Sequence, residues 1–254
     1  MVLPEGKKIY FVSDSHFGVP DYASSLAREK LLVKWLDSIK ADAAEIYLLG
    51  DIFDYWFEYK SVVPKGFVRF LGKIAELSDA GIPIYHFTGN HDMWVFSYFE
   101  RELGIKTYRK PIEKTINGKL FFIGHGDGLG PGDYGYKLIK WLFSVKLFQS
   151  IYSFLHPGIG MSVFLFFSKK SRNANGSKDA VFRGIANERH LAFCREMIQK
   201  KKYNYFVFGH RHLPIHIEVE PDTYYISTGD WLKSFSYGVF DGTEMHLRKM
   251  NTSE

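Results

Sequence analysis

The sequence of 254 residues contains a single cysteine, Cys194, so the chain cannot form an internal disulfide. A chain without disulfides fits a reducing compartment, and we expect the cytoplasm. Cys194 lies in a helical pattern beside Phe193 and Met197, which predicts packing rather than a nucleophilic role. The first ten residues lead straight into a strand pattern and lack an apolar signal-peptide core. No uninterrupted apolar run of about eighteen residues occurs, so no segment is expected to span a bilayer.

Acidic residues are also in deficit, with 28 Asp and Glu against 33 Lys and Arg and a formal charge of +5. This balance favours an anionic partner, such as a phosphorylated metabolite, an acidic lipid head group or nucleic acid. The basic residues form no concentrated stripe with interleaved aromatics, so nucleic acid is not the expected partner. Aromatic residues are abundant at 17%, and they favour an apolar ligand pocket or a membrane-facing surface.

The first half of the chain alternates between strand and helix patterns. Apolar residues recur with helical spacing over residues 22–40 and 65–77. Between and after them lie β-prone runs at residues 8–13, 45–49, 82–87, 112–116, 119–123, 205–208, 215–219, 224–227, 237–240 and 244–248. Asn117-Gly118 joins two of these runs and predicts a type I′ hairpin. The βαβ order predicts a layered α/β fold with two packed sheets.

Residues 132–172 differ in kind because they are helical in character, broken at Pro157-Gly158 and apolar on more than one face. We expect an inserted helical, apolar cap at residues 132–172 and a core made of residues 1–131 and 173–254. The polar stretch 168–179 has the composition of a loop. The apolar side chains of the cap are Trp141, Leu142, Phe143, Leu147, Phe148, Phe154, Leu155, Phe164, Phe166 and Phe167. An ordinary helical hairpin packed on the core is the plainer alternative.

Five short clusters share one pattern, a hydrophobic strand followed by a loop rich in Gly, Asp and His. They are DSHFG, GDIFD, GNHD, GHGD and GHRH, and they contain Asp14, His16, Asp51, Asp54, Asn90, His91, Asp92, His125, Asp127, His210 and His212. The carboxyl ends of strands are where α/β sheets assemble binding sites. Carboxylate oxygens, an amide oxygen and imidazole nitrogens are ligands for divalent cations. Two such cations can share a bridging carboxylate and activate a nucleophile for phosphoester hydrolysis.

The remaining histidines are expected to be structural. Each lies outside the five clusters, within a strand or helix pattern or before a proline: His86, His156, His190, His216 and His246.

The five clusters resemble the motifs of the calcineurin-like metallophosphoesterases, from Ile9 to about Trp231. The resemblance implies an αββα sandwich with two metal positions. One position would take Asp14, His16, Asp51 and His212, and the other Asp51, Asn90, His125 and His210, with Asp51 bridging. It also implies that His91 lies near the leaving group and that Asp92 orients it.

Within that family the chain resembles the UDP-2,3-diacylglucosamine diphosphatases of lipid A biosynthesis. Asp133 and Tyr136 in GDYGY match a motif after the GHGD loop, and Gly229-Asp230-Trp231 matches a closing loop. The matching segment after the cap contains Asn175, Ser177 and Lys178. The resemblance implies that these five cap-side residues bind the substrate.

The implied reaction is attack by a metal-bridging hydroxide on the α-phosphorus, which releases UMP and 2,3-diacylglucosamine 1-phosphate. The implied cofactor is manganese, although the ligand set would also accept iron or zinc. A lipid-linked nucleotide substrate implies a cytoplasmic protein in peripheral contact with the inner-membrane surface. The better-known members carry Arg in place of His91. That departure leaves another phosphodiesterase, a nuclease or a nucleotide pyrophosphatase as alternatives. A non-catalytic scaffold would tolerate gaps in the ligand set, and here every position is filled.

Overall fold

The computed structural model describes residues 1–179, 181–182 and 184–251, with side chains up to Lys169 in the long helix that ends at Asp179. In chain order the elements are β1 (Lys8–Val12), α1 (Tyr22–Ile39), β2 (Ala43–Leu48), α2 (Val68–Asp79), β3 (Ile84–Phe87), α3 (Tyr98–Leu103), β4 (Lys106–Tyr108), β5 (Ile112–Ile116), β6 (Lys119–Ile123), α4 (Tyr134–Ser144), α5 (Lys146–Ser153), α6 (Pro157–Asp179), α7 (Arg189–Ile198), β7 (Tyr205–Phe208), β8 (Pro214–Glu220), β9 (Thr223–Thr228), β10 (Ser236–Phe240) and β11 (Met245–Lys249). They form a six-stranded sheet, β11-β10-β1-β2-β3-β4, and a five-stranded sheet, β5-β6-β7-β9-β8.

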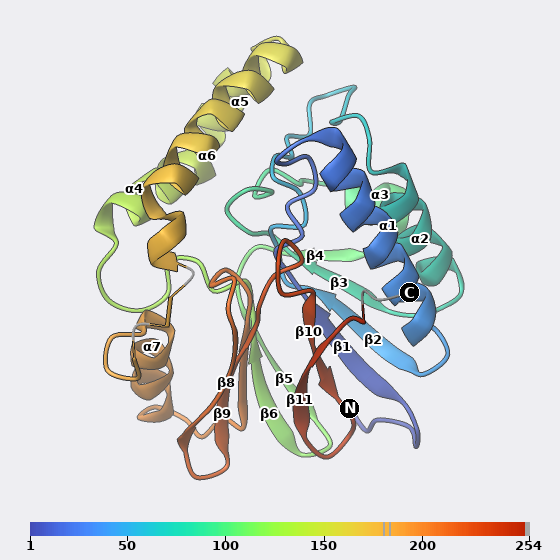
Figure 1. Cartoon of the computed structure of the whole chain (residues 1–254), viewed down its shortest axis with the longest axis vertical. Coiled ribbons are helices and arrows are strands. Elements are labelled where there is room, and N and C mark those ends of the chain that lie inside the picture. Colours follow the sequence, from blue (N-terminus) through green and yellow to red (C-terminus); the bar gives the residue numbers. More distant parts are fainter. Residues whose placement is uncertain (180, 183, 252–254) are drawn as a thin grey trace.

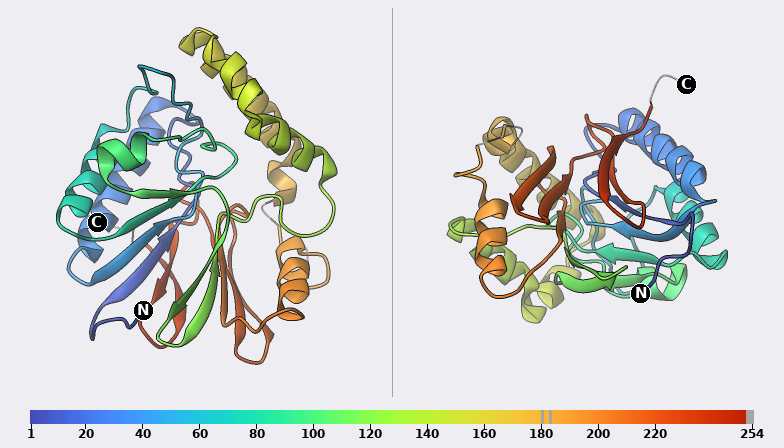
Figure 2. Two further views of the ribbon diagram at one scale, coloured as in Figure 1. Left: turned by 180° about the vertical axis from the view of Figure 1, so that it is seen from behind. Right: turned by 90° about the horizontal axis from the view of Figure 1, so that it is seen from below.

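The two sheets lie face to face, and helices cover their outer faces (Figure 1, Figure 2). Helices α1, α2 and α3 cover the six-stranded sheet, and α7 covers the other. Three buried apolar clusters fill the interfaces. One contains Trp35 beneath the α1–α2 layer, one contains Phe11 and Phe121 between the sheets, and one contains Cys194 and Phe208 beneath α7. The predicted αββα sandwich is confirmed, and Cys194 is fully buried as a packing residue.

Local chemistry explains several element boundaries. The side chain of Asp21 accepts the Ser24 N–H at 2.9 Å and thereby caps the start of α1. Asn117 and Gly118 have φ values of 47° and 77°, as a type I′ turn requires, so the predicted hairpin between β5 and β6 is confirmed. Pro157 is the first residue of α6, where its missing N–H costs no helical bond.

One prediction along the chain is wrong, and two short elements were missed. Helix α6 continues to Asp179, so residues 168–179 are not a loop and the cap helix does not end at residue 172. Polar composition alone does not end a helix, because Lys, Arg and Ala are good helix formers. Helix α3 and strand β4 were not predicted, because elements of six and three residues are too short to show a period.

Helices α4, α5 and α6 form an arm that projects from the body of the sandwich (Figure 1). The arm contacts the core through an aromatic cluster in which Phe143, Phe148 and Phe164 pack against core residues that include Trp94. The Trp94 indole donates a hydrogen bond of 3.0 Å to the Phe143 carbonyl. The arm is therefore attached through a buried apolar contact beside the loop that follows β3.

Candidate metal centre

The seven predicted ligands lie in loops at the carboxyl ends of five strands, where the two sheets meet. Asp14 and His16 follow β1, Asp51 follows β2, Asn90 follows β3, His125 follows β6, and His210 and His212 follow β7. Asp14, His16, Asp51 and His125 are buried, and Asn90, His210 and His212 are partly exposed. The loops that carry them pair through backbone hydrogen bonds such as Asp14 N–H to the Gly50 carbonyl at 3.0 Å. The sheet edges therefore bring distant segments of the chain to one point.

The side chains form two groups joined by one carboxylate. Donor atoms of Asp14, His16 and His212 lie within 4.8 Å of one another, and so do those of Asp51, His125 and His210. Asp51 Oδ2 lies 3.4 Å from His125 Nε2 and 3.8 Å from His16 Nε2, so it faces both groups. This is the place expected of a bridging ligand, although the role of each residue as a ligand stays a prediction.

Asn90 belongs to the second group. Its Oδ1 lies 3.4 Å from His125 Nε2. The structure therefore brings all seven predicted ligands together.

The donor set fits a cation. Asp14 Oδ1 is buried and accepts no hydrogen bond from the described residues. It lies 3.3 Å from His212 Nε2, which itself lies 3.3 Å from His16 Nε2. A carboxylate oxygen and two imidazole nitrogens that converge in this way offer three lone pairs to one point. A divalent cation would satisfy all three, whereas one proton would satisfy two.

The electrostatics of the cluster also favour positive charge. Burial lowers the pKa of His16, but Asp14, Asp54 and Asp51 outweigh burial and raise that pKa to about 10. Burial also lowers the pKa of His125, but the Asp51 carboxylate outweighs burial and raises that pKa to about 10. Burial raises the pKa of Asp51, yet His125 and His91 outweigh it and hold that pKa well below its usual range. The carboxylates thus create a local potential that attracts cations.

The backbone at the site is strained. Asp14, His16, Asp51, His210 and His212 all have positive φ, between 41° and 66°. Non-glycine residues rarely adopt this region, and such outliers cluster at functional sites.

Two glycines allow the close approach of these loops. A Cβ on Gly50 would lie 2.7 Å from both Gly89 N and His125 Nδ1, and a Cβ on Gly209 would lie 2.7 Å from Asp14 Oδ2. The glycines of the GDIFD and GHRH motifs are therefore spatial requirements of the site.

The outer nitrogens of the ligand histidines His16 and His125 have partners that hold the rings. His16 Nδ1 lies 3.1 Å from Asp54 Oδ1, and His125 Nδ1 lies 2.6 Å from the Leu49 carbonyl. The sequence analysis assigned no role to Asp54, although this residue belongs to the GDIFD motif. Its carboxylate is buried and also accepts a hydrogen bond of 3.4 Å from Ser168 of α6, which links the arm to the site.

The expected pairing of His91 with Asp92 is wrong. The Asp92 carboxylate accepts the backbone N–H groups of Gly89, Asp51 and Ile52 at 2.7, 3.3 and 2.8 Å, so it braces the loops. His91 Nδ1 instead lies 3.1 Å from the carbonyl of Asp54. Backbone amides compete successfully for Asp92 because the carboxylate is fully buried among them.

The predicted substrate contacts have protein partners of their own. Asp133 lies at the start of α4 and forms an ion pair with Arg189 at 2.6 Å. The Tyr136 hydroxyl donates to Asp127 Oδ2 at 2.5 Å, and Lys140 pairs with the same carboxylate at 2.6 Å. The side chains of Asn175, Ser177 and Lys178 lie outside the part of the chain that the structure describes.

Among the described residues, none of the histidines expected to be structural belongs to the two ligand groups. His86 is fully buried on β3, and His190 is bonded to the Gly126 carbonyl and the Tyr225 hydroxyl at 2.8 and 2.9 Å. His246 lies on β11, 3.0 Å from the exposed Asp241.

A cavity of about 280 Å³ lies beside the second group. Its wall includes the ligand His125, the basic side chains Arg109 and Lys110, and Lys140 paired with Asp127. Arg109 donates to the Met93 carbonyl at 3.0 Å. Positive charge next to a ligand histidine suits a bound phosphate group.

Comparison with known proteins places the fold and the motifs in one family. The family model for calcineurin-like phosphoesterases matches residues 7–214. UDP-2,3-diacylglucosamine hydrolase of Porphyromonas gingivalis is 36% identical over 97% of this chain and 99% of that protein. The protein of the same name from Haemophilus influenzae Rd is 26% identical over 91% and 93%. A dimetal phosphatase from Danio rerio has a similar structure over 96% of both chains, with 14% identity and a TM-score of 0.49.

The chain therefore belongs to the calcineurin-like phosphoesterase family. The predicted family and the prediction of a metal-dependent phosphoesterase are both confirmed.

Replacement of Gly50 by Ala should damage the metal centre. The new Cβ would collide with Gly89 and the His125 ring, at a φ of 90° that alanine tolerates poorly. We expect Gly50→Ala to lose most bound metal, measured by elemental analysis after dialysis, and to lower the melting temperature. Gly72→Ala on α2 is the control, because nothing lies within 4 Å of its Cβ. Equal metal content in both variants would contradict the assignment.

Proposed function

We propose that this protein hydrolyses the pyrophosphate bond of UDP-2,3-diacylglucosamine to UMP and 2,3-diacylglucosamine 1-phosphate. The observation that carries the proposal is an aromatic cluster directly beside a polar metal centre. The His91 ring lies edge-on to Phe164 of α6, with centroids 6.1 Å apart. A phosphoester with a long apolar group is the substrate that needs both surfaces at once. The name of the Porphyromonas gingivalis relative, which spans nearly all of both chains, supports the same substrate.

The apolar half of the substrate would lie against the cap. Phe164 also packs on Tyr55 and Trp94, at centroid distances of 5.1 and 5.7 Å, so the rings form a continuous wall. Tyr152 and Phe57, whose ring centroids lie 4.7 Å apart, extend that wall. Tyr55, Phe57, Trp94 and Tyr152 are buried and hold the partly exposed Phe164 in place. Acyl chains, which gain about 0.8 kcal/mol for each buried methylene, would lie against Phe164.

The glucosamine ring would lie between α4 and the carboxyl-terminal part of α6. Asp133 and Tyr136 are proposed to contact it, together with Asn175, Ser177 and Lys178. Because Asp133 is half exposed and paired with Arg189, a sugar hydroxyl can reach its carboxylate without removing a buried bond.

We propose two divalent cations, in the first position on Asp14, His16, Asp51 and His212, and in the second on Asp51, Asn90, His125 and His210. Bound there, they would neutralise the pyrophosphate and activate a water for attack on phosphorus. We propose manganese, the metal that the resemblance to the diphosphatases implies; the mixed carboxylate, amide and imidazole set would also accept iron or zinc.

His91 is proposed to stabilise the leaving phosphate. Its Nδ1 is held by the Asp54 carbonyl, which leaves Nε2 as the nitrogen that can face the substrate. The leaving group is a phosphate monoester whose second pKa is about 6, so it scarcely needs a proton. A hydrogen bond that offsets developing charge is sufficient, and this accounts for His or Arg serving at one position.

The nucleotide half is proposed to enter the cavity beside His125. This cavity lies beside His125 of the second ligand group, whereas His91 lies beside Phe164 of the cap. The nucleotide half and the lipid half of the substrate would therefore extend in different directions from Asp51. The basic side chains of the cavity would offset phosphate charge, and its volume of about 280 Å³ suits a small polar ligand.

The outer surface of the cap supports a peripheral place on the cytoplasmic face of the membrane. Phe154 at the end of α5 is 88% exposed, Leu147 69% and Trp141 62%. Residues 134–178 contain seven Lys and Arg and no Asp or Glu. Apolar side chains among basic ones favour an anionic lipid surface. Within the described residues, no helix combines the length and hydrophobicity that crossing a membrane would require.

The substrate assignment can be tested by direct assay. Purified protein with manganese should release UMP from UDP-2,3-diacylglucosamine, measured by chromatography, far faster than it hydrolyses bis-p-nitrophenyl phosphate. Asp51→Ala should reduce turnover close to the uncatalysed level, because the shared ligand is lost. Rapid turnover of the diester or of DNA with the lipid nucleotide left intact would refute the proposal and favour a phosphodiesterase or nuclease.

The nucleotide cavity predicts a charge effect on substrate binding. Lys110→Glu should raise KM for the lipid nucleotide about tenfold, which corresponds to 1.4 kcal/mol, with kcat largely retained. Lys106→Glu on the neighbouring strand β4 is the control, because Lys106 does not line the cavity. If both variants keep the wild-type KM, the nucleotide lies elsewhere.

The membrane proposal predicts a loss of binding when the exposed cap is charged. Phe154→Asp should sediment several-fold less with vesicles of phosphatidylethanolamine and phosphatidylglycerol, because a carboxylate opposes both burial and the anionic surface. Val68→Asp, at an apolar position on α2 that is 72% exposed, should bind as wild type does. Unchanged sedimentation of Phe154→Asp would rule out the cap as the contact.

A further inference from the structure

The closing loop Gly229–Trp231 follows β9, and its aspartate is buried beside the metal centre. Asp230 is 3% exposed. Its Oδ1 accepts the backbone N–H groups of Lys233 and Ser234 at 2.9 and 2.8 Å, and the Ser234 hydroxyl at 3.0 Å. Three donors to one oxygen fix the plane and direction of the carboxylate. The other oxygen therefore points in a direction that the loop itself determines.

That second oxygen faces a ligand histidine. Asp230 Oδ2 lies 3.4 Å from His212 Nδ1. The opposite nitrogen of the ring, Nε2, lies 3.3 Å from both Asp14 Oδ1 and His16 Nε2. A proton at Nδ1, on the side of the carboxylate, would leave the lone pair of Nε2 for the cluster. A carboxylate behind a ligand histidine fixes the tautomer and strengthens the ligand.

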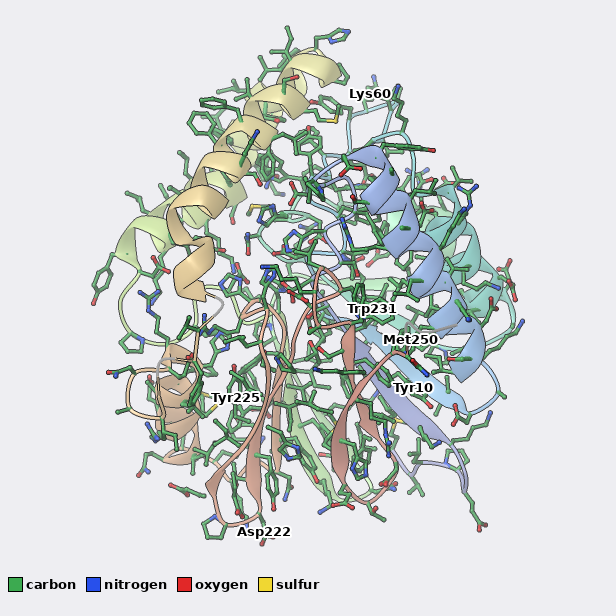
Figure 3. The ribbon with its side chains drawn as sticks, viewed as in Figure 1. Tyr10, Lys60, Asp222, Tyr225, Trp231 and Met250 are labelled. Carbon is green, nitrogen blue, oxygen red and sulfur yellow. The ribbon has the colours of Figure 1, made fainter. Side chains whose placement is uncertain are left out.

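The loop is anchored in the core, so the position of Asp230 does not depend on a bound group. Trp231 is fully buried (Figure 3). Its ring is tilted by 58° against that of Trp35 of α1, with centroids 5.5 Å apart, and its indole N–H donates to the Ser236 carbonyl at 3.0 Å. Its backbone N–H also donates to the Asp14 carbonyl at 3.1 Å. The loop thus contacts Asp14 through the backbone of Trp231, and His212 through the side chain of Asp230.

We propose that Asp230 is a positioning residue that holds His212 for the cation at the first position. Both histidines of this position have a carboxylate behind them, Asp54 at His16 and Asp230 at His212. His125 of the second position has only the neutral Leu49 carbonyl. Because Asp230 faces His212 of the first position, its loss is expected to weaken that position alone. The inference rests on the metal centre and not on the identity of the substrate.

Asp241 offers a matched control elsewhere in the chain. Its Oδ1 accepts the N–H groups of Thr243 and Glu244 at 2.8 and 2.9 Å and the Thr243 hydroxyl at 2.7 Å. Its Oδ2 lies 3.0 Å from His246 Nε2. The same local arrangement of loop, carboxylate and histidine thus occurs at an exposed place away from the cluster.

The test compares Asp230→Asn with Asp241→Asn. An asparagine keeps one oxygen for the loop donors, but its amide N–H would face His212 and reverse the tautomer. We expect Asp230→Asn to bind one of two manganese ions about 10- to 100-fold more weakly, measured by titration of metal-free protein against a competing chelator. Asp241→Asn should bind both ions as wild type does. Wild-type affinity at both positions in Asp230→Asn would overturn the proposal.

A second variant separates positioning from folding. Asp230→Ser keeps a short acceptor for the loop N–H groups and removes the oxygen that faces His212. We expect metal-free Asp230→Ser to melt within a few degrees of wild type and to show the same weakened manganese site, with kcat recovering at high manganese. An unchanged manganese affinity in this folded variant would assign Asp230 a purely structural role. Because manganese binding is measured without substrate, this test of Asp230 remains valid even if UDP-2,3-diacylglucosamine is not hydrolysed.

Discussion

The carboxylate of Asp51 is buried where the two sheets meet, and much of the molecule is arranged around its charge. One oxygen accepts the backbone N–H of His91 at 2.8 Å, and the other faces His125 and His16. A buried carboxylate costs several kcal/mol unless opposite charge and hydrogen bonds offset it. Those partners come from loops after β1, β3 and β6, so the two sheets must keep a fixed relative position for the charge to be compensated.

The scaffold meets that requirement at a local conformational cost. Five ligand residues occupy left-handed backbone conformations, and each costs of order 1–3 kcal/mol. Three apolar layers hold the strands whose ends carry these turns. Asp92 contributes by tying Gly89, Asp51 and Ile52 together through their amides. The strain is therefore local, whereas the packing energy that offsets it is spread over the whole sandwich.

Sequence patterns predicted the strands, the hairpin and the convergence of the seven ligands, because period, turn chemistry and strand-end position are all local signals. They missed α3 and β4, which are too short to show a period. They also misplaced the loop at residues 168–179, where polar residues continue a helix. The pairing of His91 could not be predicted, since it depends on which carbonyl the fold brings close. Asp54 and Asp230 were visible in motifs, but their targets are set by tertiary geometry.

The cap is apolar on both its inner and outer surfaces, and this bears on how a lipid substrate travels. Phe143 and Phe164 face the aromatic wall, while Trp141 and Phe154 face outward on the same arm. For the proposed substrate, acyl chains would pass from bilayer to active site along protein surface and not through water. Each methylene that avoids exposure spares about 0.8 kcal/mol. The apolar surface of the arm would thus lower the free-energy barrier to extraction of the lipid from the bilayer. It would do the same for the return of the product, which is still acylated.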